Sequence, residues 1–361
     1  MRRPPIRILD VAGSPGAMGH IHGATYADEI RAYAKERVEL VAEGLWSGVP
    51  LDRGEVLEVA AACLEAHERQ SAPLYEEMEA MAASAGISLA ESVVVGGFTD
   101  FVDTIRAEVG SHHPRRVMED TCTAFIVPDS RASGAGFFGQ TWDMHASATD
   151  HVILMRTRPD DGPGAVVFTT TGCLGQIGMN ELGVCVGINN LTAADGRRGV
   201  MWPTVIRQVL LAESAEEARD VILSADLAGG HNYLVFDGDG TGFNIEAMPT
   251  VRPVTGLRSE ALVHTNHTTT ADTDAVQGNR SPDLQESSRR RMVAAADHLD
   301  RRVVSVDDLM ELTRNQVCQV SEPPYHIETS GAAVMRPKTA DFWAVWGLPS
   351  MNDYVRVGFL S

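Results

Sequence analysis

Asp120-Thr121-Cys122-Thr123-Ala124-Phe125-Ile126-Val127 is the stretch that decides the fold, because a polar approach changes at a cysteine into an apolar strand. Gly139-Gln140-Thr141-Trp142-Asp143 ends 21 residues after Cys122 and predicts the return strand of a hairpin. Such a hairpin would bring Cys122 and Asp143 to the same end of one sheet. The cysteine is therefore a candidate nucleophile with an aspartate nearby.

A nucleophilic thiol needs a base within hydrogen-bond reach. Cys122 would carry its own base if the chain were cut between Thr121 and Cys122, because an α-amine has a pKa of about 7.7–8.0 and is partly neutral near pH 7. The amine and the thiol would then be held close by covalent bonds alone. A free cysteine taken by itself is more often a small buried hydrophobic residue, so the case for Cys122 depends on the surrounding pattern.

Composition sets the broad limits. The chain has 361 residues, of which 44% are hydrophobic and 22% charged, which is typical of a globular protein with one large core or two domains. A formal net charge of −19 argues against a nucleic-acid partner. The sequence has no apolar run of 18 residues and no apolar segment after its basic first residues, so we expect neither a membrane span nor an export signal.

The number and spacing of the cysteines indicate the redox environment of the protein. The five cysteines are irregularly spaced and form no CxxC motif, so neither a disulfide framework nor a zinc knuckle is indicated. Free thiols are typical of a reducing compartment, and we expect a cytoplasmic protein.

Residues 1–116 have the apolar spacing of helices. The predicted helices cover 28–46, 55–70, 73–85 and 88–101, and residues 110–116 form a polar linker that marks the best boundary in the chain. We therefore divide the chain into a helical N-terminal segment, residues 1–121, and a catalytic part, residues 122–361. The helices have too many apolar faces for a disposable leader, so the segment should stay bound after cleavage.

After the linker the apolar period changes to two, and strands and helices then alternate in groups. Strands are predicted at 122–128, 136–143, 151–157, 165–171, 233–237, 243–248, 261–265, 331–335, 341–346 and 354–359, with a further hairpin over 173–190. Helices are predicted at 203–212, 215–224, 284–299 and 305–315, and an exposed loop at 268–285. Arg289-Arg290-Arg291 is interpreted as a solvated helix face. This order predicts a layered α+β sandwich.

Several motifs in this order resemble the acyl-coenzyme A:isopenicillin N acyltransferase family of autoproteolytic cysteine N-terminal-nucleophile (Ntn) enzymes, with the bile-acid hydrolases and penicillin V acylases as more distant relatives. The resemblance covers nearly the whole chain. The motifs that carry it are Cys122-Thr123-Ala124-Phe125, Gly139-Gln140-Thr141-Trp142-Asp143, Gly178-Met179-Asn180-Glu181-Leu182-Gly183, Ile188-Asn189-Asn190 and His264-Thr265-Asn266-His267, with Gly13 to Gly23 and Ala83 to Ile87 upstream.

The resemblance implies the four-layer αββα Ntn fold, a zymogen that cleaves itself between Thr121 and Cys122, and amide-bond hydrolysis or acyl transfer. By position, Cys122 is the nucleophile, Asp143 holds the freed α-amine, and Asn266 belongs to the oxyanion hole. Asn189 matches a second asparagine, and Gln140 stands where the bile-acid hydrolases have arginine. Thr121 replaces the glycine of the best-known acyltransferase, and a β-branched residue is less free to adopt a strained peptide.

Three functions remain open at this point. The first is an amidohydrolase or acyltransferase that works through an acyl-Cys122 thioester, without cofactor or metal, on a small acyl amide or acyl thioester such as an acyl-coenzyme A. The second is an unprocessed, non-catalytic binding protein on the same scaffold. The third is a metal hydrolase that uses His264 and His267, although histidines three apart on a strand point to different faces. Homo-oligomerisation, the acyl group and its acceptor are not determined by the sequence.

Overall fold

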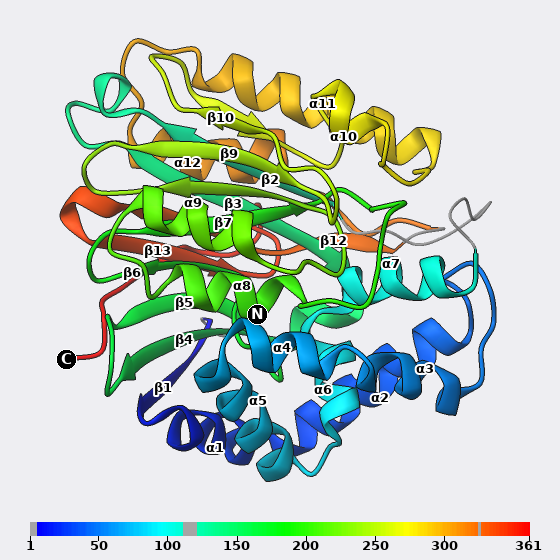
Figure 1. The fold of residues 1–361 in the computed structure, drawn as a ribbon. Helices are drawn as coiled ribbons and strands as arrows, with labels where there is room; N and C mark the ends of the chain where they lie inside the picture. Colours follow the sequence, from blue (N-terminus) through cyan, green and yellow to red (C-terminus); the bar gives the residue numbers. More distant parts are fainter. Residues whose placement is uncertain (1–5, 111–120, 324–325) are drawn as a thin grey trace.

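Two β-sheets packed face to face form the centre of the computed structural model, which describes residues 6–110, 121–323 and 326–361 (Figure 1). Within these residues the larger sheet has eight strands and the smaller has six. The larger sheet runs in the order β1 (Arg7–Gly13), β4 (Val152–Pro159), β5 (Ala165–Thr170), β6 (Ile177–Asn180), β7 (Cys185–Asn190), β8 (His231–Phe236), β9 (Gly242–Ala247) and β10 (Val254–Gly256). The smaller runs in the order β11 (Leu262–His264), β2 (Thr121–Val127), β3 (Phe137–His145), β12 (Ile327–Arg336), β13 (Asp341–Trp346) and β14 (Val355–Val357).

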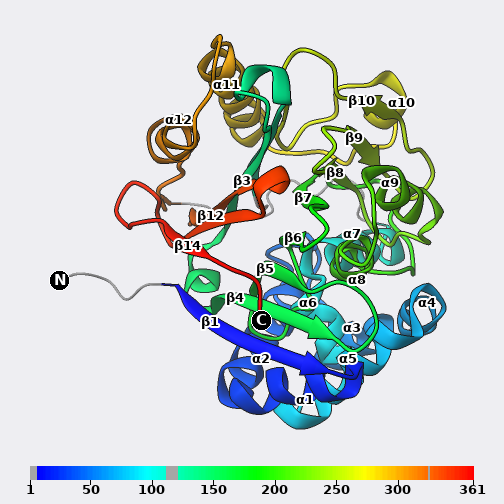
Figure 2. The ribbon, with the colours of Figure 1, turned by 90° about the vertical axis from the view of Figure 1, so that its left-hand side faces the viewer.

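Helices cover the outer faces of both sheets. Apolar residues of α8 (Trp202–Val209) and α9 (Ala215–Ser224) pack on the larger sheet, and those of α11 (Pro282–Leu299) and α12 (Val306–Glu311) pack on the smaller one. Between the sheets, side chains such as Phe138 and Phe168 share one core. Figure 2 shows the α11 and α12 layer and the α8 and α9 layer on separate sides of the strands. The predicted four-layer α+β arrangement is confirmed.

The N-terminal segment is helical, as predicted, but it also supplies one strand. Its helices are α1 (Pro15–Thr25), α2 (Ala27–Ala42), α3 (Arg53–Ala61), α4 (Leu64–Gln70), α5 (Ala72–Ala85), α6 (Leu89–Gly96) and α7 (Phe98–Glu108). The strand is β1, which pairs in parallel with β4 at the edge of the larger sheet. The sequence interpretation assigned no strand to residues 7–13, so β1 is an addition to the mostly helical segment that it predicted. Apart from Gly110, the predicted linker lies outside the described residues.

Local sequence signals explain where the helices begin. Ser88 and Glu91 form a reciprocal capping box at α6, and Ser305 and Asp308 form one at α12. The loop expected over 268–285 contains the one-turn helix α10 (Ala271–Asp274), and α12 continues into a π-helical turn, Leu312–Gln316. No single helix of the described residues is long and apolar enough to cross a membrane; α5 and α6 meet the length and composition criteria only as a pair bent by 107°.

Candidate active site

Cys122 lies at the start of β2, between two antiparallel neighbours. On one side β3 places Trp142 opposite Cys122 and Asp143 opposite Thr121, which confirms the predicted hairpin. On the other side β11 places His264 opposite Ala124, so the chain that continues from β11 brings Asn266 beside Cys122. The Cys122 side chain is fully buried in this uncut chain.

Thr121 and Cys122, on either side of the expected cleavage position, are held by polar contacts. The Cys122 amide N–H donates to Asn266 Oδ1 at 2.7 Å, and the Cys122 carbonyl oxygen accepts from Arg291 Nη1 at 2.5 Å. The Thr121 hydroxyl donates to Asp143 Oδ2 at 3.0 Å. The backbone at the expected cleavage position is therefore fixed from three directions.

Arg291 is the site residue that the sequence interpretation missed. It is buried rather than on a solvated face, because its position on α11 falls in line with Leu284, Ser288, Ala295 and Leu299 on the side of the helix that faces the sheet. Arg289 and Arg290 are exposed, as expected. The helical spacing of Arg291 relative to Leu284 and Ala295 is the signal that could have found it.

The guanidinium of Arg291 joins the groups around the cysteine. Its Nη1 atom also donates to Thr123 Oγ1 at 2.8 Å, and its Nη2 atom donates to Asn266 Oδ1 at 3.0 Å. Burial lowers the pKa of Arg291, whereas the nearby Asp143 and Cys122 act in the opposite direction. A buried guanidinium is stable here because carbonyl, hydroxyl and amide oxygens accept its hydrogen bonds.

Asp143 is buried at the end of β3 and receives hydrogen bonds on both carboxylate oxygens. In addition to the Thr121 hydroxyl on Oδ2, the Thr329 hydroxyl from β12 donates to Oδ1 at 2.7 Å. Asp143 therefore lies close to the Thr121–Cys122 link and accepts hydrogen bonds from two hydroxyl groups. Its role in holding a freed amine stays a prediction.

Asn266 is positioned by its own backbone and by both ends of its amide. Its N–H donates to Ser288 Oγ at 2.8 Å, and its side-chain Nδ2 donates to the Asn190 carbonyl at 3.2 Å. Its Oδ1 atom is the acceptor for Cys122 and Arg291. In the uncut chain the NH2 group is therefore directed at the Asn190 carbonyl. That it donates a hydrogen bond to an oxyanion stays a prediction, to be tested on the processed protein.

Gln140 and Asn189 come from opposite sheets. Gln140 on β3 binds the Ile188 backbone twice, since its Nε2 donates to the Ile188 carbonyl at 2.5 Å and its Oε1 accepts the Ile188 N–H at 2.9 Å. This contact ties the two sheets together next to Asn189. Asn189 is also buried, and its Oδ1 atom accepts from Asn232 Nδ2 at 3.4 Å. The structure thus brings both residues to the inter-sheet region, near the Asn190 carbonyl that Asn266 contacts.

The two histidines around Asn266 have separate hydrogen-bond partners. His264 Nε2 lies 2.9 Å from Glu246 Oε1, and its Nδ1 lies 2.8 Å from the Thr265 carbonyl. His267 Nδ1 lies 2.7 Å from Ser288 Oγ, and burial lowers its pKa to about 4. Across residues 6–110, 121–323 and 326–361 there is no cluster of three or more metal-ligating side chains. His264 contacts the carbonyl of Thr265, and His267 contacts Ser288 Oγ, which also accepts the Asn266 N–H.

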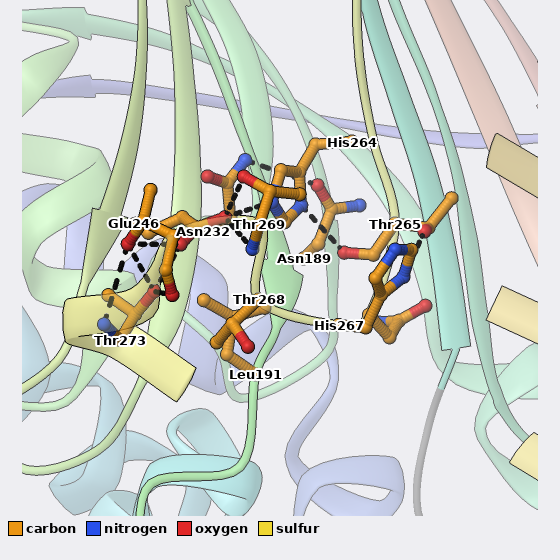
Figure 3. Close-up of polar contacts among 12 residues, drawn as sticks. Asn189, Leu191, Asn232, Glu246, His264, Thr265, His267, Thr268, Thr269 and Thr273 are labelled. Atoms are coloured by element: carbon orange, nitrogen blue, oxygen red, sulfur yellow. Dashed lines mark hydrogen bonds and ion pairs between the residues drawn. The ribbon is translucent and has the colours of Figure 1, made fainter. Parts of the chain in front are cut away.

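Glu246 is the centre of the network shown in Figure 3, where Glu246 and Thr273 lie on one side of His264 and Thr265 lies on the other. Its carboxylate also accepts from the backbone N–H of Thr269 at 2.7 Å and the hydroxyl of Thr269 at 2.5 Å. Burial alone would raise the pKa of Glu246, but His264 and the threonine donors outweigh it and lower the pKa to about 2. Glu246 is therefore ionised and fully engaged, and it supports the segment that carries Asn266.

The remaining cysteines lie in different surroundings. Cys63, Cys173 and Cys185 are buried, and burial raises the pKa of Cys63 and of Cys173 to about 11 and that of Cys185 well above its usual value. Cys318 is only partly buried. High thiol pKa values disfavour nucleophilic thiolates at the three buried positions.

The site thus consists of a strand-end cysteine, an aspartate opposite the preceding residue, an asparagine on the cysteine N–H and a buried arginine on its carbonyl. A family model described as acyl-coenzyme A:6-aminopenicillanic acid acyl-transferase matches residues 130–324, which is more than half of the chain. The chain belongs to this acyltransferase family.

The chain is also similar to individual proteins. The chain is 25% identical over 259 residues to the acyl-coenzyme A:6-aminopenicillanic-acid-acyltransferase 40 kDa form of Emericella nidulans, which covers 71% of this chain and 67% of the relative. Similar solved structures include a conjugated bile acid hydrolase from Clostridium perfringens (TM-score 0.45, 11% identity, 66% of this chain and 97% of that one). Another is penicillin V acylase from Agrobacterium tumefaciens (TM-score 0.42, 12% identity, 66% and 86%).

Proposed function

We propose that this protein is a self-processing cysteine Ntn enzyme that cleaves or forms the amide bonds of small N-acyl compounds through an acyl-Cys122 thioester. The observation that carries the proposal is the set of contacts around the Thr121–Cys122 link, together with membership of the acyltransferase family. The N–H of that link, the next carbonyl group and the Thr121 hydroxyl all have polar partners in the uncut chain. Such an arrangement suits a bond that the protein itself rearranges.

The reaction would take place in two stages. First, the Cys122 thiol adds to the Thr121 carbonyl, the C–N bond to Cys122 breaks, and water releases the new Thr121 carboxylate. The freed α-amine of Cys122 then takes the proton from its thiol, which attacks the substrate carbonyl and expels the amine. Water or a second amine accepts the acyl group from the thioester. Asp143 would stabilise the ammonium form of the terminus, and Asn266 Oδ1 would keep its contact with the same nitrogen.

The substrates of this chain would be small acyl amides, with acyl-coenzyme A as a further acyl donor. This expectation comes from the family and from its Emericella nidulans relative. The N-terminal fragment would stay bound as a second subunit, because its helices share the core between the sheets. Free thiols at Cys63 and Cys173 are consistent with our proposal of a cytoplasmic location.

Intact mass spectrometry of the purified protein tests the first stage. We expect two polypeptides, residues 1–121 and 122–361, from the wild type and a single chain from Cys122→Ala. Iodoacetamide should label the new N-terminal cysteine before the other thiols and abolish turnover of acyl amides, whereas EDTA should have no effect. An active wild-type protein that remains one uncut chain would contradict self-processing, and zinc-dependent activity would favour a metal hydrolase.

A further inference from the structure

Asn189 and Asn232 form a buried pair across the β7–β8 ladder. They are directly opposite each other in the register, and both side chains are fully buried. The pair makes one hydrogen bond, from Asn232 Nδ2 to Asn189 Oδ1. In the part of the chain that the structure describes, Asn189 Nδ2 and Asn232 Oδ1 have no hydrogen-bond partner.

The face of β7 that carries Asn189 looks toward the nucleophile's sheet. Gly187, two residues earlier on the same face, is so close to Gln140 and Phe138 of β3 that a Cβ atom would collide with both. Side chains alternate along a strand, so Asn189 points the same way as Gly187. The backbone carbonyl of the next residue, Asn190, contacts Asn266, and Asn266 contacts the Cys122 N–H.

The single bond within the pair decides how the Asn189 amide is turned. Because the carbonyl end of Asn189 is held by Asn232, the NH2 end is the one left open on the side of the sheet that faces β2 and β3. A buried NH2 without a partner destabilises a folded protein and requires an explanation. Donors fixed in advance are what stabilise a developing oxyanion.

We propose that Asn232 is a positioning residue that turns the NH2 group of Asn189 toward the oxyanion formed when Cys122 attacks a carbonyl carbon. The inference rests on the proposed thiol chemistry. Asn232 itself need not touch the substrate. Glu246, opposite Asn232 on β9, cannot take over this task because its oxygens are already bonded to His264 and to threonine groups.

Replacing Asn232 by aspartate reverses the hydrogen-bonding direction at almost constant size. Burial and the neighbouring Glu246 oppose ionisation of the introduced carboxyl, but at a pH high enough to ionise it the group only accepts hydrogen bonds. The Asn189 amide should then turn its NH2 toward residue 232 and its carbonyl toward the oxyanion. We expect kcat for an acyl amide to fall by about 10²–10³ in Asn232→Asp, with little change in KM. The loss should exceed that in Asn232→Ala. A merely structural role predicts the opposite order, because aspartate preserves the shape.

The pH dependence of kcat in Asn232→Asp provides a second test of the proposal. A protonated carboxylic acid can donate to Asn189 Oδ1 as the asparagine does. The ratio of kcat in Asn232→Asp to kcat in the wild type should therefore rise as the pH is lowered. The titratable groups near position 232 are Glu246, opposite it on β9, and His264 from β11, which contacts Glu246, and both are unchanged in the variant. A ratio independent of pH would contradict the proposal.

Three controls complete the experiment. Asn244→Asp places the same change on β9, away from Asn189, and should leave kcat within about twofold of the wild type because it removes no oxyanion donor. If Asn232→Asp does not fold, Asn232→Ser, which keeps a donor, should exceed Asn232→Val in kcat at least tenfold; equal rates would overturn the proposal. If Cys122→Ala were still active, the proposed function would fail instead, whereas an inactive Cys122→Ala with a fully active Asn232→Asp refutes only the role of Asn232.

Discussion

The Cys122 site and the contact of α7 with the strands are both buried and polar, but their polar groups bind different kinds of partner. On α7, Asp100 accepts from the Trp202 backbone N–H at 2.8 Å, and Asp103 accepts from the backbone N–H groups of Ala193 at 2.8 Å and Gly230 at 3.2 Å. These partners are permanent parts of the chain. Around Cys122, the partners surround a link that the proposed chemistry would break.

In the described parts of the chain, both regions also contain buried polar atoms without a hydrogen bond. At α7, Asp100 Oδ1 and His231 Nδ1 lie 2.8 Å apart, although the geometry is not that of a hydrogen bond. Next to the Cys122 site, Asn189 Nδ2 has no such neighbour among the described residues. A buried donor without a partner requires an explanation, and the proposed oxyanion chemistry supplies one for Asn189. Substitutions in the two regions should therefore affect different measurements.

Asp143→Asn should give the largest effect of the site substitutions. The neutral amide cannot stabilise the ammonium form of the freed terminus, and proton transfer at Cys122 is needed both for self-cleavage and for turnover. Because positioned acid–base groups contribute about 10²–10⁴ to a rate, we expect both rates to fall by at least about 10². Gel electrophoresis measures the first rate and an acyl amide assay the second.

Asp237→Asn is the matched control for Asp143. Asp237 is also buried, but it accepts only from backbone N–H groups, those of Ala215, Asp239 and Thr241. Its replacement should lower the melting temperature and leave cleavage intact. Equal effects of the two substitutions on the cleavage rate would show that Asp143 is structural.

Asn266→Ala should reduce kcat by about 10²–10³, equivalent to about 2.7–4 kcal/mol of transition-state stabilisation, if its amide serves the oxyanion. KM should change little, because the charge develops only in the transition state. The contact of Asn266 Oδ1 with the Cys122 N–H adds a second expectation, slower self-cleavage. Steady-state kinetics of the processed protein and the time course of processing separate the two contributions.

Asn180 provides the comparison for Asn266. It is fully buried and uses both ends of its amide on permanent backbone groups, for example the Ala212 carbonyl and the Val184 N–H. Asn180→Ala should cost about 1–3 kcal/mol of stability for the groups left unpaired and leave kcat nearly unchanged. A folded, processed and fully active Asn266→Ala protein would remove Asn266 from the oxyanion hole.

Arg291→Lys should have an intermediate effect. A lysine keeps the charge but cannot reach the Cys122 carbonyl, Thr123 and Asn266 together, since only the guanidinium has a planar fork of donors. Hydrogen bonds to charged groups contribute about 1.5–3 kcal/mol, so we expect cleavage or kcat to fall by about 10- to 150-fold. Arg290→Lys, on the exposed face of α11, should behave as the wild type in the same assays. Two indistinguishable variants would mean that Arg291 only packs.

Arg291 also shows where prediction from the sequence succeeds and where it ends. The hairpin of Cys122 and Asp143 was predictable because a period of two and a short connection specify nearby partners. The spacing of Arg291 on a helix was visible as well, but three successive arginines indicate a solvated face unless the position of each is set against the apolar stripe. Most helices and strands agree with the expectation within a few residues for the same local reason.

α1 (Pro15–Thr25) was also missed, although Ser14 and Pro15 are local helix-start signals. The strand β1 and the contacts between distant strands could not be predicted, for a different reason. β1 pairs with β4, about 145 residues away, so the sequence near residues 7–13 contains no signal for its parallel partner. The Asn189–Asn232 pair and the Glu246–His264 contact also depend on which strands become neighbours. Local sequence specifies elements, whereas the contacts between distant strands that complete the site are specified only by the assembled sheets.

Asp103→Asn should give the smallest effect on catalysis and a clear effect on the pH dependence of stability. Burial raises the pKa of Asp103 to about 7, above the value of about 3.9 for an unfolded aspartate. Between these values the folded protein keeps a proton that the unfolded chain has lost. The contribution to the free energy of unfolding is therefore complete below about pH 4 and is lost as the pH rises through about 7.

Urea unfolding of the wild type and Asp103→Asn between about pH 4 and pH 8 measures this contribution directly. The wild type should lose stability relative to the variant as the pH rises, because asparagine does not titrate. The kcat of the processed variant should stay within about twofold of the wild type. Among the described residues Asp103 contacts the backbone of Ala193 and Gly230 and pairs with Arg106 at 3.9 Å, and none of these groups takes part in the proposed reaction. A tenfold loss of kcat at unchanged stability would erase the distinction between the α7 contact and the Cys122 site.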